Sequence, residues 1–127
     1  MQRSNEIKQI RSSSEIAMGN DNGRVFLCSL MTSVKTLRLV LTEGVSDLKS
    51  RSKADFYKLM DLVATYKFSG VNDNNPYGEN DFGTIKTDSG KFFFKFDYYD
   101  LDFHYGADPY TDRDFARVLT ILRADEY

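Results

Sequence analysis

Apolar and polar residues alternate at a period of two in two parts of the chain, and this pattern predicts β-strands. The first part is residues 36–42, and the second is residues 91–100, the most aromatic stretch of the sequence. Residues 81–87 precede the second strand, and residues 88–90 (Asp-Ser-Gly) form the turn of a predicted β-hairpin. The side chains expected on the buried faces of the two strands are Leu37, Leu39, Leu41, Phe92, Phe94, Phe96 and Tyr98.

A helical period predicts one long helix over residues 52–68. Ser52 is a suitable N-cap, and Asp55 three residues later completes an approximate capping box. Ser69 and Gly70 end the pattern. The apolar side chains that recur at helical spacing, and are expected to pack on the sheet, are Phe56, Leu59, Met60, Val63 and Phe68.

Weaker patterns occur near the two ends of the chain and after the first strand. Residues 1–22 are polar, with isoleucines spaced for a short helix that the turn-forming residues after Met18 would end. Residues 24–31 are mainly apolar and predict a buried strand, whereas residues 43–44 (Glu-Gly) predict a turn. Residues 115–123 predict a short helical turn leading into a strand.

The order of these elements predicts an α+β fold in a single domain, as expected for 127 residues. The expected sheet is antiparallel, and the helix over residues 52–68 covers one of its faces. Residues 1–22 are assigned to a polar, partly flexible N-terminal segment, and residues 23–127 are assigned to the domain.

Composition favours a cytoplasmic protein that does not enter a membrane. Hydrophobic residues make up 41% of the chain and charged residues 28%, which is typical of globular proteins. The longest apolar run, residues 25–31, is far too short for a membrane span. The one cysteine, Cys28, cannot form an internal disulfide and is expected to be a buried apolar side chain.

The net charge of −2 conceals an asymmetry, because residues 1–68 are basic and residues 69–127 are acidic. An acidic half argues against direct nucleic-acid binding and suits a decoy for a basic partner, although a solvated surface is the simpler interpretation. The aromatic row in residues 91–100 is expected to be core, since a stacking platform for bases needs exposed rings beside basic residues.

Residues 72–83 form a long stretch rich in Asn, Asp, Gly and Pro, and ordered loops of this length often carry function. One hypothesis is a site for Mg²⁺, Mn²⁺ or Ca²⁺, which prefer oxygen ligands. Its candidate ligands are Asp73, Glu79 and Asp81 in the loop and Asp97, Asp100, Asp102 and His104 at the end of the neighbouring strand. The alternative is that these residues bond their own backbone in Asx turns, with Pro76 and Gly78 fixing the bend.

Three motifs, in this order, resemble the DUF3768 family. They are residues 72–83 (NDNNPYGENDFG), 93–100 (FFKFDYYD) and 117–127 (RVLTILRADEY), and the similarity covers about residues 39–127. The resemblance implies a small bacterial protein, common on plasmids and other mobile elements, without an assigned activity.

The chain departs from the family pattern at three positions. Asn75, Asn80 and Phe94 occur where the pattern has aspartate, histidine and tryptophan. An amide at position 80 neither transfers protons nor binds metals well near neutral pH, so the change argues against a catalytic loop.

The leading functional hypothesis is a non-enzymatic, macromolecule-binding protein of a mobile element, such as an anti-defence or anti-CRISPR inhibitor. Its expected partner is a host or defence protein, and no cofactor is expected. The alternatives are a metal-dependent hydrolase or nuclease that uses the carboxylates of residues 73–81, and an oligomerisation module such as a homodimer. The proposed binding-surface residues are Asp73, Asn75, Tyr77, Glu79, Asn80, Asp81, Phe82, Tyr99, Asp100, His104 and Tyr105.

Overall fold

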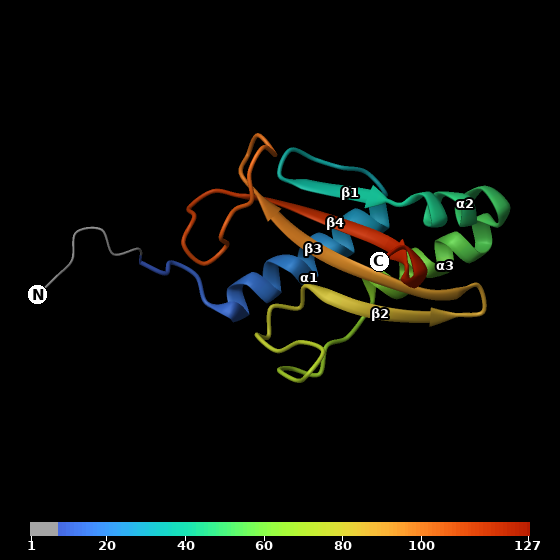
Figure 1. Ribbon diagram of the computed structural model, residues 1–127, viewed down its shortest axis with the longest axis horizontal. Coiled ribbons are helices and arrows are strands. Elements are labelled where there is room, and N and C mark those ends of the chain that lie inside the picture. Colours follow the sequence, from blue (N-terminus) through green and yellow to red (C-terminus); the bar gives the residue numbers. More distant parts are fainter. Residues whose placement is uncertain (1–7) are drawn as a thin grey trace, which may run out of the picture.

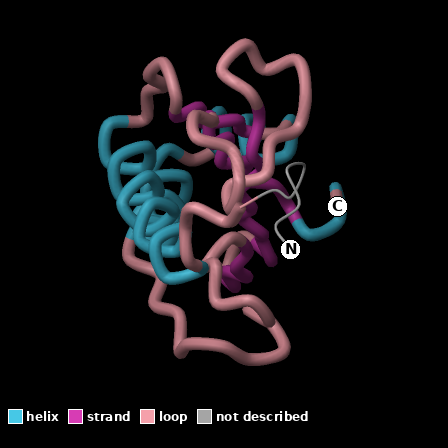
Figure 2. Tube along the Cα trace, turned by 90° about the vertical axis from the view of Figure 1, so that its left-hand side faces the viewer, coloured by secondary structure: helices cyan, strands magenta, loops and turns pink. Residues whose placement is uncertain are grey.

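The computed structural model describes residues 8–127, which form a four-stranded sheet with helices on one of its sides (Figures 1 and 2). The elements in chain order are α1 (Ser13–Leu30), β1 (Leu37–Leu41), α2 (Glu43–Arg51), α3 (Lys53–Ala64), β2 (Phe82–Thr87), β3 (Gly90–Tyr99), β4 (Ala116–Arg123) and the 3-10 turn η1 (Ala124–Glu126). The α+β class is therefore confirmed.

The strand order in the sheet is β1-β4-β3-β2. The predicted hairpin is present as β2 and β3, and β4 pairs antiparallel to β3. However, β1 runs parallel to β4, with Leu39 opposite Leu119, so the sheet is mixed and not antiparallel throughout. The last strand of the chain inserts between β1 and β3, a long-range pairing that no local pattern encodes.

The largest correction concerns α1, which includes residues 24–31, the segment predicted to be a strand. Ser12 and Glu15 form a capping box at its start, and the helix continues through Gly19 and Gly23. These glycines permit close packing: a Cβ at Gly19 would lie 2.2 Å from the Arg117 guanidinium. They are therefore contact positions and not turns.

The predicted N-terminal boundary between residues 22 and 23 consequently falls inside α1. The isoleucine at position 7 and the rest of residues 1–7 lie outside the described residues. Within residues 8–127, no helix is both long and apolar enough to cross a membrane.

The helices after β1 begin at capped residues. Residues 43–44, predicted to be a turn, are the first residues of α2. The predicted long helix is α3, whose N-cap Ser52 accepts a hydrogen bond from the backbone N–H of Asp55. It ends at Ala64, so Phe68 lies beyond the helix although it packs against the core.

The core lies between the helices and one face of the sheet. Phe92, Phe94 and Phe96 of β3 are buried there, as their spacing predicts. Cys28 is buried in the same cluster, and burial raises the pKa of its thiol to about 12. Because side chains alternate along a strand, the remaining sheet residues point away from the helices. We call that side the open face.

The C-terminal prediction was correct for the strand and wrong for the helical turn. β4 occupies Ala116–Arg123, whereas the turn η1 follows the strand instead of preceding it.

Candidate functional site

The polar loop, residues 70–81, is held by hydrogen bonds among its own side chains and backbone. Asn75 is only 2% exposed, and its amide donates to the carbonyl of Gly70 and the side-chain oxygen of Asn80. In return, the backbone N–H of Asn80 donates to the Asn75 side-chain oxygen at 3.0 Å. Asn80 has a φ of 56°, a left-handed conformation that asparagine adopts more readily than most residues. The backbone N–H of Asn74 also donates to the Asn72 side-chain oxygen at 2.9 Å, so the Asx-turn interpretation is supported at Asn72.

The polar loop is also bonded to α1. The side-chain amide of Asn80 donates to both carboxylate oxygens of Asp21, which forms a 2.5 Å ion pair with Arg24. Arg24 is 2% exposed and donates to the carbonyls of Val63 and Tyr66. Its Nε has no hydrogen-bond partner, and within residues 8–127 it is the only buried side-chain nitrogen or oxygen atom of this kind. A charge buried in this way stabilises one arrangement of helix and loop.

Asn20 makes a second link between α1 and the loop, and it is fully buried. Its amide donates to the Glu79 carbonyl at 3.0 Å and to the Tyr98 hydroxyl at 2.8 Å, while its oxygen accepts from Nε of Arg117 at 2.8 Å. Tyr110 donates its hydroxyl to the Glu79 carboxylate.

Burial shifts the ionisation of this cluster. Burial raises the pKa of Tyr98 to about 12, so its hydroxyl stays protonated and can donate or accept hydrogen bonds at neutral pH. Burial also raises the pKa of Asp81, and the nearby carboxylate of Glu79 adds to the shift. The same effect lowers the pKa of Arg117. The cluster is therefore a structural network around Asn20.

The carboxylates proposed as metal ligands do not meet as one set, although Asp81 lies near Glu79 and Asp97, the latter in an ion pair with Lys95. Among residues 8–127, no group of three or more His, Cys, Asp and Glu side chains is arranged to hold a metal ion. Asp73, Asp102 and His104 are exposed, and Asp100 accepts a hydrogen bond from the backbone N–H of His104. These residues form local turns at the surface.

The predicted binding-surface residues thus divide into two sets. Asn75 is buried, and Glu79, Asn80, Asp81, Phe82, Tyr99 and Asp100 are partly buried. The exposed residues are Asp73, Tyr77, His104 and Tyr105, with Tyr77 and Tyr105 more than 70% exposed.

An apolar surface that sequence reasoning missed lies along the outer side of α1. Met18, Val25 and Leu30 are 63%, 50% and 58% exposed, and Phe26 lies beside them. Val71 of the polar loop is 71% exposed and lines the same 520 Å³ depression as Met18. We define these five residues as the α1–loop surface. The strand predicted for residues 24–31 gives no such surface, because it separates this segment from Met18. In a helix, Met18 and Val25 are spaced to lie on one face.

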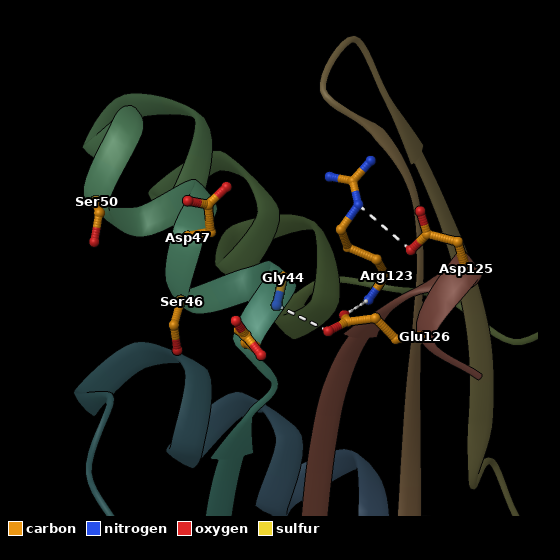
Figure 3. Close-up of a pocket in the computed structure, with 8 residues that line it drawn as sticks. Gly44, Ser46, Asp47, Ser50, Arg123, Asp125 and Glu126 are labelled. Atoms are coloured by element: carbon orange, nitrogen blue, oxygen red, sulfur yellow. Dashed lines mark hydrogen bonds and ion pairs between the residues drawn. The ribbon is translucent and has the colours of Figure 1, made fainter.

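Another depression, of about 580 Å³, lies between α2 and the end of β4 (Figure 3). Its central carboxylate, Glu126, accepts from the backbone N–H groups of Gly44 and Arg123 at 2.8 Å each and from the Thr42 hydroxyl at 2.7 Å. Glu126 therefore caps the N-terminus of α2. Its bonding capacity is used within the chain.

Comparison with known proteins decides the family. The family model described as "Protein of unknown function (DUF3768)" matches residues 41–126. The chain belongs to the DUF3768 family. The match begins after α1, so Asn20 and Asp21, which bond the polar loop, lie outside the matched residues. No curated protein and no solved structure matches the chain significantly.

Proposed function

We propose that this DUF3768 protein works without catalysis, by binding a protein partner through the α1–loop surface. The observation that carries the proposal is the chemistry of the outer side of α1. Asp21 and Arg24 pair with each other and bond the loop and α3, so the exposed residues after Asp21 are Asn22, Val25, Phe26, Ser29 and Leu30. Helices facing water normally carry charges, and uncharged apolar patches are typical of protein interfaces.

The internal bonds of the loop support the same function. Hydrogen bonds through Asn75 and Asn80 fix the loop against α1, and this fixes the position of Val71 relative to Met18. A surface already ordered before binding loses less conformational entropy when a partner docks. The mobile-element association implied by the family resemblance favours a host defence protein as the partner, and inhibition of a CRISPR nuclease is one concrete form.

The test is capture of a stoichiometric partner from host lysate by the tagged protein, followed by variants that add charge. The double variant Met18→Glu/Val25→Glu should abolish capture, because it places two carboxylates in the interface. The matched control is Val40→Glu/Tyr57→Glu, at positions 43% and 48% exposed outside this surface, and it should retain the partner.

Two outcomes would overturn the proposal. One is equal capture by both double variants. The other is a wild-type dimer in light scattering that only Met18→Glu/Val25→Glu converts to a monomer, which would assign the surface to a second copy of the chain.

A further inference from the structure

A cluster of lysine and aromatic side chains occupies the open face at β2 and β3. The register places Lys86 opposite Lys91, Thr84 opposite Phe93, and Phe82 opposite Lys95. These residues alternate with Gly83, Ile85, Phe92 and Phe94, which are buried on the helix side, so all six point to the open face. Together with Tyr127 they form what we call the lysine–aromatic patch.

Two lysines of the patch are not neutralised by an ion pair within residues 8–127, although Asp88 lies in the turn that joins their strands. Lys86 and Lys91 are exposed, face each other across the two strands, and take part in none of the ion pairs of residues 8–127. Like charges directly opposite in a sheet destabilise it. Lys95 differs, because it pairs with Asp97 on the same strand. An unneutralised lysine pair that costs stability points to an anionic ligand.

The acidic residues of 69–127 are unevenly distributed: β2 contains none and β3 contains one, Asp97, although Asp88 lies in the turn between Lys86 and Lys91. Five of these acidic residues lie in the segment between β3 and β4: Asp100, Asp102, Asp108, Asp112 and Asp114. The net charge of residues 69–127 argues against nucleic-acid binding. A ligand, however, contacts one surface of the folded protein, and the charge of that surface decides whether it binds.

Three aromatic rings adjoin the lysines. The ring centroids of Phe82 and Phe93 are 5.1 Å apart, and the Tyr127 ring stands 5.9 Å and 5.5 Å from them at steep angles. Tyr127 is 75% exposed, and the Lys91 ammonium lies 5.5 Å from the Phe93 centroid. The patch therefore combines an exposed ring, that of Tyr127, with two exposed lysines on the same face of the sheet.

We propose that the lysine–aromatic patch binds single-stranded nucleic acid. Lys86 and Lys91 contact phosphates, and a base stacks on the ring of Tyr127, which Phe82 and Phe93 support. Unpaired bases expose the faces that stacking requires, whereas a duplex hides them. The site is separate from the α1–loop surface, because the patch lies on the side of the sheet that the helices leave uncovered (Figure 2).

The test is fluorescence anisotropy with a labelled oligothymidylate of about 12 nucleotides at about 50 mM salt. Lys86→Glu/Lys91→Glu should weaken binding at least about tenfold and reduce the slope of log affinity against log salt by about 1.4, the share of two phosphate contacts. Tyr127→Ala should weaken binding about tenfold through lost stacking. Lys35→Glu/Lys49→Glu, with the same change in net charge outside the sheet, should bind like the wild type.

Several results would overturn the proposal while leaving the protein-partner proposal untouched. They are absence of binding at low salt, equal loss in both lysine double variants, and affinity for heparin equal to that for the oligonucleotide with no effect of Tyr127→Ala. Circular dichroism confirms that each variant is folded. Met18→Glu/Val25→Glu should bind the oligonucleotide normally, which separates the two surfaces.

Discussion

The polar loop and the open face of the sheet both carry polar side chains, but the side chains are bonded within the chain in the loop and partly unpaired on the open face. In the loop, Asn75 and Asn80 bond each other and α1. On the open face, Lys86 and Lys91 form no ion pair among the described residues. Buried polar groups are nearly always paired, so a polar side chain indicates a ligand only where its bonding capacity remains unused.

The two sides of α1 show the same difference. The inner side buries Asn20 and Arg24, whereas the outer side exposes Met18, Val25 and Leu30. This reverses the usual distribution of polar and apolar residues on a surface helix. The inner polar residues hold the loop against α1 by hydrogen bonds, and the outer apolar residues form the surface that we propose for a protein partner.

The largest expected effect tests whether the inner side of α1 is structural. Asn20→Ala leaves the carbonyl of Glu79, the hydroxyl of Tyr98 and Nε of Arg117 without this partner. We expect the free energy of unfolding, measured by urea denaturation, to fall by about 3 kcal/mol.

Asn22→Ala, on the exposed side of the same helix, is the control and should change the free energy of unfolding by less than about 0.5 kcal/mol. Equal effects at Asn20 and Asn22 would remove the distinction between the two sides.

Gly83 and Thr84, adjacent residues of β2 that point to opposite faces of the sheet, allow the helix-covered face to be compared with the open face. A Cβ at Gly83 would lie 2.3 Å from the ring of Phe94, so Gly83→Ala should cost about 2 kcal/mol through overpacking. Thr84→Ala, one residue on and facing outward, should cost less than about 1 kcal/mol. Thermal and urea unfolding of the two variants measure the difference, and a costlier Thr84→Ala would mean that the open face is packed against something.

The elements with complete periodicity could be predicted from the sequence. The β2–β3 hairpin, β1 and the start of α3 follow from local alternation and capping. The helix α1 could not be predicted in this way, because Gly19 and Gly23 resemble turn signals. In the structure they allow close contact with Arg117 and Leu37, which lie far along the chain. Local patterns do not encode such contacts.

The site was harder to predict for the same reason. The composition of the polar loop predicted either a functional surface or a set of Asx turns, and the hydrogen bond from Asn74 to Asn72 supports the second for that part of the loop. Nothing in the sequence shows that Asn75 and Asn80 would be occupied by internal bonds. The length of the hairpin turn decides which residues face each other on the open face. The predicted turn, residues 88–90, is one residue longer than the turn in the structure, where Thr87 pairs with Gly90 and Lys86 faces Lys91.

A smaller effect tests the cost of the lysine pair. Lys91→Glu converts a like-charge pair with Lys86 into an opposite-charge pair, so the fold should gain about 0.5 kcal/mol and melt about 2 °C higher. The gain should shrink at high salt, where exposed charges are screened. The same variant should bind oligothymidylate more weakly, so that stability and binding change in opposite directions. A fall in melting temperature would show that Lys86 and Lys91 do not repel each other.

The smallest effect is a pH dependence located where the polar loop meets β2. Burial and the nearby Glu79 raise the pKa of Asp81 above its ordinary value of 3.8. The folded state therefore binds the Asp81 proton more tightly than the unfolded state does, and this contribution to stability is full below pH 3.8 and is lost as the pH rises through the folded pKa. Asp81→Asn stays neutral, so its stability relative to the wild type should increase from about pH 4 to pH 7 in urea titrations. A relative stability that stays constant or decreases over this range would mean that Asp81 is solvated like an ordinary surface carboxylate. The carboxylate would then be as free for a ligand as the lysines of the open face, and the contrast between the two regions would narrow.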